Sequence, residues 1–172
     1  MSAGTGGRPG RSRSAPSAAA LTVQVATRSR RVPSPHQLRR WTRAALARPA
    51  QVTLRIVGER EGESLNRAFR REPHATNVLT FHYDERDAGC AGPRAPLRGD
   101  IVLCAPVIAR EARSQGKPLE AHYAHLTVHG LLHLQGYDHE RAREAHAMEA
   151  REIAILKRLG YPNPYAAEEL RA

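Results

Sequence analysis

The stretch HGLLHLQGYDH, residues 129–139, spaces three histidines in a pattern that predicts both a local fold and a chemistry. His129 and His133 are four residues apart, so on a helix they lie one turn apart and can bind one metal ion. Gly136 suits the end of that helix, because glycine readily adopts the left-handed conformation that turns a chain back. The turn then allows His139 to reach the same ion. We therefore predict a metal site made of a helix, a tight turn and a third histidine.

The pattern favours a catalytic metal over a structural one. Three neutral imidazoles leave a fourth coordination position open, whereas a structural zinc ion usually has a fourth protein ligand, commonly cysteine, and none is nearby. Zinc peptidases share this histidine spacing but carry a glutamate after the first histidine as general base. Gly130 occupies that place here. Peptide hydrolysis is therefore disfavoured, and an ion that keeps its full positive charge favours an anionic substrate such as a phosphodiester.

Two further histidines precede the motif on the same predicted helix. At 100° per residue, the four histidines fall within about 80° of one helix face. We predict that His125, one turn before His129, orients a ligand or the substrate. His122 is interpreted as an ordinary residue of the helix surface, and Asp138 as a cap of the following helix rather than a ligand.

Length and charge indicate one soluble domain with a polyanionic partner. The chain has 172 residues, and no apolar run approaches the roughly 18 residues of a spanning helix, so we expect no membrane association. Residues 1–58 contain eleven arginines and no acidic residue, while the rest carries 16 basic and 17 acidic residues, giving the net charge of +10. This asymmetry suggests nucleic acid as a partner. The alternative is an arginine-rich composition without a partner. Cys90 and Cys104 are expected to be free thiols in a reducing compartment.

Hydrophobic periodicity predicts an α+β fold in which helices pack on a small mixed β-sheet. Residues 1–20, rich in Gly, Ser, Pro and Arg, are expected to form a disordered basic extension, with an organelle transit peptide as the alternative. We predict one domain at 21–165 and a tail at 166–172. Strands are expected at 21–27, 51–58, 77–83 and 100–105. Helices are expected at 34–47, 62–70, 105–115, 118–135 and 139–159.

The histidine motif and several other segments resemble one known family. HGLLHLQGYDH is preceded by AHLTV, and the chain also contains SLNRAFR, ATNVLTF, RGDIVLC and the closing MEAREIAILKRLGYPNPY. These segments resemble, in the same order, those of the YbeY family of bacterial endoribonucleases, the rRNA maturation factors. The resemblance covers residues 21–165, which is nearly the whole part of the chain that we expect to be ordered.

The resemblance implies a zincin-like α+β fold, with the metal-binding helix in the C-terminal half, and a single-strand-specific, metal-dependent endoribonuclease. It implies roles in 16S rRNA 3′-end maturation, ribosome biogenesis and ribosome quality control. Carried over, His129, His133 and His139 are the ligands of one zinc or other divalent ion. Arg70 is the functional arginine, suited to grip a phosphate bidentately, and His125 is expected to help bind the substrate. The expected partners are ribosomal RNA and the small ribosomal subunit in the cytoplasm, and the chain is expected to be a monomer.

Two departures from the family pattern and two alternative functions accompany this interpretation. Ala75 and His82 stand where the family often has proline, which changes backbone stiffness and leaves the site assignment intact. One alternative is a zinc metallopeptidase-like hydrolase, which Gly130 opposes. The other is a non-catalytic RNA-binding ribosome assembly factor with a structural metal. The missing glutamate leaves three candidates for proton transfer: a hydroxide on the metal, His125, or the RNA's own 2′-hydroxyl.

Overall fold

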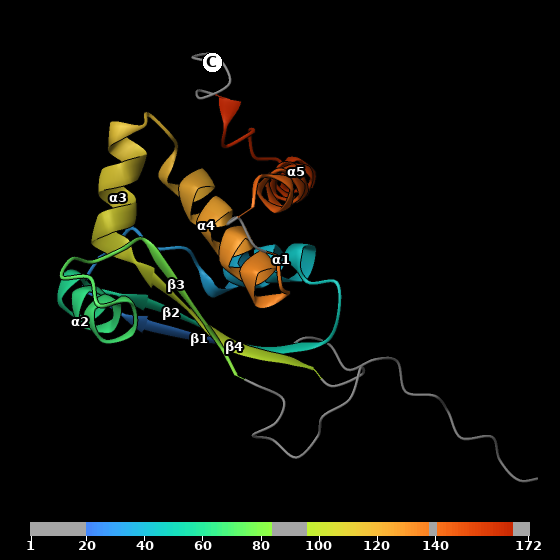
Figure 1. The fold of residues 1–172 in the computed structure, drawn as a ribbon. Helices are drawn as coiled ribbons and strands as arrows, with labels where there is room; N and C mark the ends of the chain where they lie inside the picture. The colour runs from blue at the N-terminus through green and yellow to red at the C-terminus, as the bar shows by residue number, and fades with distance from the viewer. Residues whose placement is uncertain (1–19, 84–95, 138–140, 167–172) are drawn as a thin grey trace, which may run out of the picture.

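The computed structural model describes residues 20–83, 96–137 and 141–166, which form four strands and five helices. Figure 1 shows their arrangement. Nearly all of the predicted basic extension and of the C-terminal tail lies outside these ranges, and so do Cys90, Asp138 and His139. No helix within the described ranges combines the length and apolar character needed to cross a membrane. The predicted α+β class is confirmed.

A four-stranded mixed sheet forms the centre of the fold. The strands are β1 (Ala20–Ala26), β2 (Ala50–Val57), β3 (Val78–His82) and β4 (Leu97–Cys104). Their order is β1-β2-β4-β3, in which β1, β2 and β4 run parallel and β3 runs antiparallel to β4. Parallel neighbours need a crossover connection, and α1 (Pro35–Ala45) supplies the one between β1 and β2. The strand β3 is therefore one of the two edge strands of the sheet.

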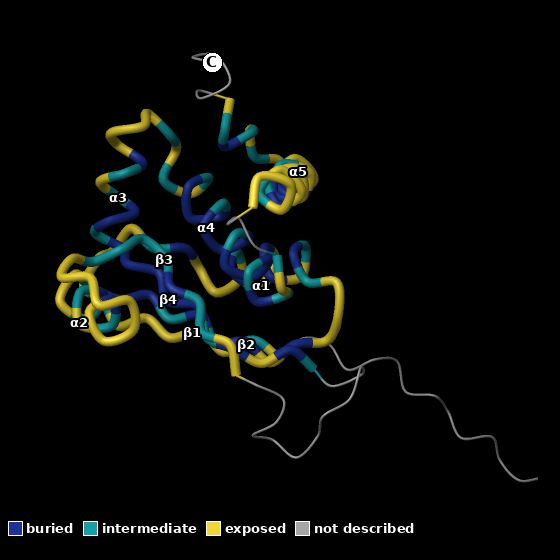
Figure 2. The backbone as a smooth tube through the Cα atoms, in the orientation of Figure 1, coloured by how far each residue is buried: buried dark blue, intermediate teal, exposed yellow. Residues whose placement is uncertain are grey.

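Helices cover the two faces of the sheet unequally. The larger core cluster joins Leu54 and Ile101 of the sheet to α1, α4 (Leu119–Leu134) and α5 (Ala142–Leu159). A smaller cluster on the opposite face joins Val102 to α2 (Glu59–Arg70) and α3 (Ala105–Ser114). Figures 1 and 2 show α4 between the sheet and α5, with buried residues along its length. The helix that carries the histidine motif thus packs against neighbours on both sides.

Local sequence signals explain where the helices begin and end. Ser34 caps α1 through a capping box with Gln37, and Pro35 takes the first helical position as predicted. The helix α4 ends just before Gly136, whose φ of +90° is the left-handed conformation expected from the motif. The predicted boundaries of the nine elements agree with the structure to within a few residues.

Candidate metal centre

His129 and His133 face each other one turn apart on α4. Their Nε2 atoms are 3.1 Å apart, and their ring centroids are 4.6 Å apart. Two nitrogen ligands about 2.0–2.1 Å from one tetrahedral zinc ion are about 3.3 Å apart. The pair is therefore spaced to share one ion. The third predicted ligand, His139, lies outside the described residues, so its place at the ion stays a prediction.

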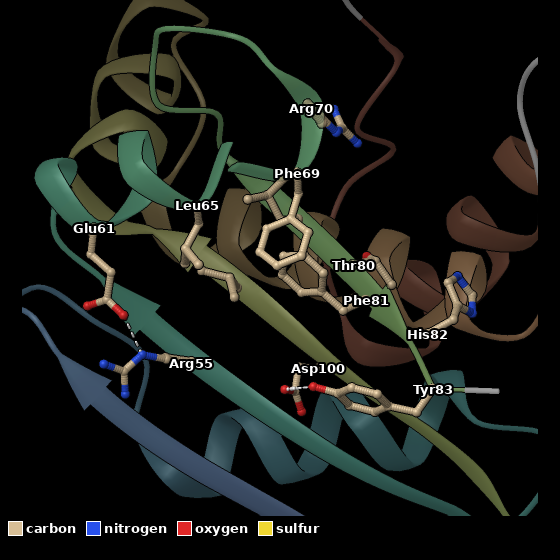
Figure 3. Close-up of a pocket in the computed structure, with 12 residues that line it drawn as sticks. Arg55, Glu61, Leu65, Phe69, Arg70, Thr80, Phe81, His82, Tyr83 and Asp100 are labelled. Carbon is tan, nitrogen blue, oxygen red and sulfur yellow. Dashed lines mark hydrogen bonds and ion pairs between the residues drawn. The ribbon is translucent and has the colours of Figure 1, made fainter. Parts of the chain in front are cut away.

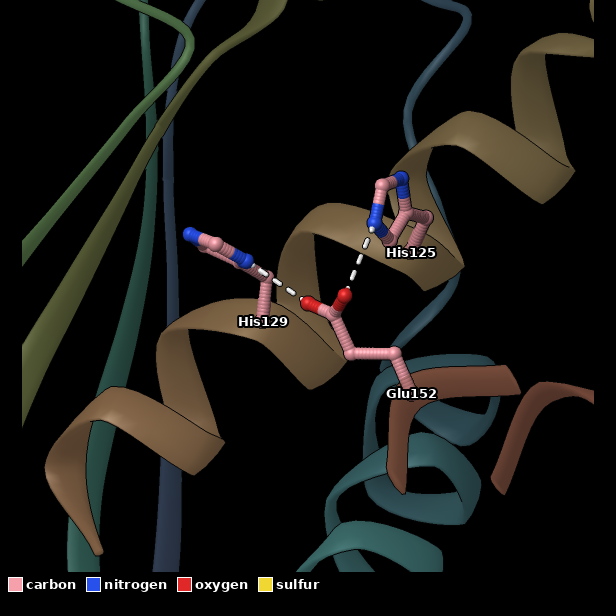
Figure 4. Close-up of side chains that lie close together, drawn as sticks. All are labelled: His125, His129 and Glu152. Atoms are coloured by element: carbon pink, nitrogen blue, oxygen red, sulfur yellow. Dashed lines mark hydrogen bonds and ion pairs between the residues drawn. The ribbon is translucent and has the colours of Figure 1, made fainter. Parts of the chain in front are cut away.

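A carboxylate from α5 holds the ring of His129 in place. Nδ1 of His129 lies 2.6 Å from Oε1 of Glu152, whose side chain is only 1% exposed; Figure 4 shows the contact. An imidazole that donates its Nδ1 proton to a carboxylate keeps the lone pair on Nε2, which is the atom that faces His133. Glu152 thereby fixes the tautomer that a metal ligand requires.

The other oxygen of Glu152 is also bound. Tyr165 donates its hydroxyl to Oε2, and Nε2 of His125 lies 3.2 Å from the Tyr165 hydroxyl and 3.6 Å from Oε2. Burial raises the pKa of Glu152, but the hydrogen bonds and charge interactions with His125 and His129 outweigh burial and lower the pKa to about 2. Glu152 is thus an ionised, buried carboxylate whose negative charge can balance a cation held at the histidines.

A second set of three residues is close enough together to hold a metal ion. One ligand atom from each lies within 4.8 Å of the others, and the residues are His125, His129 and Glu152. The 2.6 Å between Nδ1 of His129 and Oε1 of Glu152 is a charge-assisted hydrogen-bond distance. Two ligands of one tetrahedral ion lie farther apart. We therefore interpret this group as the support of the His129 ligand, and the Nε2 atoms of His129 and His133 as the metal-facing donors.

The structure places the two upstream histidines of α4 away from solvent. The interpretation of His122 as a surface residue is wrong: the residue is 4% exposed, and its Nε2 lies 2.8 Å from Oε2 of Glu111 on α3. The helix α3 packs against α4 at this point and covers the imidazole of His122. His125 points toward Glu152 and Tyr165 rather than into the space in front of the metal-facing nitrogens.

Arg70 lies in the same pocket as the histidine pair. The pocket has a volume of about 270 Å³, and its lining includes Arg70, His129 and His133; we call it the histidine pocket. Its remaining walls come from the segment around β3, namely Thr76, Asn77, Val78, Thr80 and His82. Arg70 is exposed at the last turn of α2. The fold therefore places a cationic guanidinium, which can bind an anion, beside two potential metal ligands from a distant part of the sequence.

Gly130 shows why the glutamate of a peptidase is absent. A Cβ atom at this position would lie 3.0 Å from Cγ2 of Ile101 and 3.2 Å from Oγ1 of Thr80. Both distances are at the tight end of normal contacts, so the glycine allows α4 to lie close against the sheet. A glutamate side chain at this position would have to enter space that the sheet already fills.

Sequence reasoning missed Glu152 and Tyr165, although one signal for Glu152 was present. Glu152 lies on the face of α5 that also carries Met148, Ile155 and Leu159, all buried. A charged residue in an apolar helical stripe is seldom buried without a partner. A glutamate among the apolar residues of this helix face therefore predicts a buried ion pair or a support for a metal ligand.

Several known proteins are similar to this chain over most of its length. Residues 24–160 match a family model described as endoribonuclease YbeY. The endoribonuclease YbeY of Nitrosomonas europaea is 55% identical over 148 residues, which cover 86% of this chain and 85% of that protein. The endoribonuclease YbeY of Aromatoleum aromaticum is 56% identical over 150 residues, with coverage of 86% and 92%. The solution structure of TM1509 from Thermotoga maritima is 21% identical, with a TM-score of 0.48 and coverage of 81% and 91%.

Proposed function

The chain belongs to the YbeY endoribonuclease family, and from this premise we propose that it is a metal-dependent enzyme that cleaves single-stranded RNA. The proposed metal ligands are His129, His133 and His139. The observation that carries the proposal is the histidine pocket, in which Arg70 lies beside the facing nitrogens of the two histidines. We propose zinc as the ion, since imidazole nitrogens at this spacing suit it.

The residues that line the histidine pocket, and Glu152 behind it, have complementary roles in this proposal. A bound divalent ion supplies polarisation of a phosphoryl oxygen. Arg70 binds the scissile phosphate, because its planar guanidinium can donate two parallel hydrogen bonds to phosphate oxygens. Glu152 accepts the Nδ1 proton of His129 and thereby keeps the opposite nitrogen of the ring available as a ligand. Arg70 thus binds the anionic substrate, and Glu152 orients a ligand of the cation. Both functions suit the cleavage of a phosphodiester.

We propose ribosomal RNA of the small subunit as the substrate, with 16S rRNA 3′-end maturation and ribosome quality control as the processes served. The arginine-rich, acid-free first 58 residues support a polyanionic partner of this kind. The cytoplasm, where ribosomes are assembled, is the proposed location, and a monomer is the proposed state.

The proposal is tested with a double variant, His129→Ala with His133→Ala. Wild-type protein, freed of contaminating nucleases, is expected to contain about one zinc ion per chain by elemental analysis and to cleave a single-stranded RNA oligonucleotide. The double variant is expected to lose both properties. Equal cleavage by the two proteins would refute the proposal. RNA binding without cleavage by metal-loaded wild type would instead favour the assembly-factor alternative.

A further inference from the structure

A second pocket adjoins the histidine pocket across the edge strand β3. It has a volume of about 740 Å³ and shares Arg70, Thr80 and His82 with the histidine pocket. Successive side chains of a strand point to opposite faces, so Leu79 and Phe81 line only this second pocket. Its aromatic lining comes from Phe69, Phe81 and Tyr83, and we call it the aromatic pocket. A ligand that crosses β3 beside Arg70 can therefore occupy both pockets at once.

The aromatic pocket exposes apolar surface that the fold does not use. Phe69 is 63% exposed and Tyr83 is 54% exposed. The only other large apolar side chain of the described residues with comparable exposure is Val25, at 52% on the far edge strand. The rings of Phe69 and Phe81 meet edge to face, with centroids 4.5 Å apart, and Figure 3 shows them together in the middle of the pocket. Clustered exposed rings are typical of a surface that binds a ligand.

The polar groups of the aromatic pocket are largely paired with one another. Nε of Arg55 lies 2.7 Å from Oε1 of Glu61, and the hydroxyl of Tyr83 donates to Oδ2 of Asp100 at 2.5 Å. Arg70 differs, since it makes no ion pair with any residue in the described ranges. This arrangement suits a ligand with two parts. A flat apolar part can stack on the aromatic rings, and an anionic part can bind the guanidinium of Arg70.

We propose that the aromatic pocket binds one unpaired nucleobase of the RNA, adjacent to the phosphate held by Arg70. This inference rests on the proposed function. An unstacked base can lie on aromatic side chains, whereas a base inside a duplex is already paired and stacked. Only a single strand can therefore place a base on Phe69 while its phosphate reaches the histidine pocket. The aromatic pocket thus selects single-stranded over double-stranded substrates.

The test combines a change in the protein with a change in the RNA. Metal-loaded wild type and Phe69→Ala are given single-stranded oligonucleotides in which each nucleotide flanking the cleaved bond is replaced in turn by an abasic one. In wild type, loss of the base at one position is expected to lower kcat/KM about ten- to hundredfold. Phe69→Ala is expected to cleave intact RNA more slowly by a similar factor and to be insensitive to the abasic substitution. Phe69→Trp keeps a stacking surface and should retain the sensitivity.

Val25→Ala is the matched control, because it truncates a similarly exposed apolar side chain outside both pockets. Its kcat/KM is expected to equal that of wild type, and melting temperatures verify that all variants are folded. Equal sensitivity of wild type and Phe69→Ala to the abasic substitution overturns the proposal. So does a Phe69→Ala variant that cleaves RNA normally but loses binding to a small-subunit protein, since the pocket would then serve a protein partner.

A direct binding measurement separates failure of this inference from failure of the proposed function. The probe is a single-stranded RNA that carries the fluorescent base 2-aminopurine, titrated with metal-loaded wild type and with Phe69→Ala. Quenching by wild type that Phe69→Ala lacks supports base stacking in the pocket, even if no cleavage occurs. Absence of quenching in wild type, or equal quenching by both proteins, overturns the inference.

Discussion

Replacement of Glu152 by glutamine tests the proposed support of the metal ligand. The amide has nearly the shape of the carboxylate but carries no negative charge. Nδ1 of His129 would lose its charge-assisted partner at 2.6 Å, and the hydroxyl of Tyr165 would lose an ionised acceptor. The ring of His129 would then be held less firmly in the tautomer that leaves Nε2 available. We expect Glu152→Gln to weaken metal binding while the fold is kept.

The expected loss can be estimated from the position of Glu152 behind the ligand. Removal of a carboxylate that orients a ligating histidine typically costs ten- to hundredfold in metal affinity, which is about 1.4–2.7 kcal/mol. At a free metal concentration of about 100 times the wild-type Kd, binding stabilises the folded state by about 2.7 kcal/mol. A tenfold weaker site reduces this stabilisation to about 1.4 kcal/mol. Competition with a chromophoric chelator measures the affinity, and denaturant unfolding with and without zinc measures the stabilisation.

Glu111→Gln is the matched control for this experiment. Glu111 also pairs with a buried histidine of α4, since Nε2 of His122 lies 2.8 Å from its Oε2, but neither residue lines the histidine pocket. We expect Glu111→Gln to lower the free energy of unfolding in the absence of zinc and to leave metal affinity unchanged. If Glu152→Gln bound zinc as tightly as wild type does, or if both variants weakened binding equally, the assigned role of Glu152 would be wrong.

Three further predictions concern other positions. Arg70→Ala is expected to lower kcat/KM for RNA about ten- to hundredfold, because a charge-assisted bond to phosphate is lost, while Ala at the adjacent exposed Arg71 leaves the rate unchanged. Gly130→Glu is expected to lower the free energy of unfolding by about 1–3 kcal/mol through overpacking and to produce no turnover of a peptide substrate. Burial raises the pKa of Tyr123 to about 12 from 10.0, so the stability that depends on its neutral form is complete below pH 10 and is lost as the pH rises toward 12. Tyr123→Phe should remove the part of the alkaline loss that comes from Tyr123. Tyr161→Phe, which removes a hydrogen-bonded hydroxyl, should in addition cost about 1 kcal/mol at neutral pH by denaturant unfolding.

The elements of the fold were predictable because their signals are local. The strand β2 is predicted by apolar residues that alternate with other residues, namely Val52, Leu54 and Ile56. The start of α1 is predicted by Ser34 followed by Pro35. The strand order and the antiparallel direction of β3 were not predictable in this way. They depend on pairings between segments far apart in the chain, for which hydrophobic periodicity carries no information.

The candidate site likewise has one part that local sequence signals predict and another that depends on packing between distant segments. The facing of His129 and His133 follows from their spacing within one helix, so the motif was sufficient to predict it. The approach of Glu152 depends on how α5 packs against α4, which no spacing within either helix specifies. His122 was misinterpreted because the rule of one polar and one apolar face applies to surface helices, and α4 has neighbours on several sides. Arg70 was placed at the site by family resemblance, whereas the structure provides its physical connection, a shared pocket.

Because α4 lies between the sheet and α5, the packing around Gly130, where a peptidase has its glutamate, also affects the rest of the site. The side of the helix at Gly130 contacts β3 and β4, and the side at His125 is occupied by Glu152 and Tyr165. The direction shared by the Nε2 atoms of His129 and His133 opens into the histidine pocket. A general base introduced at position 130 would therefore crowd Ile101 and Thr80, so either these side chains or α4 itself would have to shift. Because α5 lies on the other side of α4, any such shift of α4 would disturb the contact of His129 with Glu152. The packing that leaves little room for a peptidase base is thus part of the packing that positions the metal ligand.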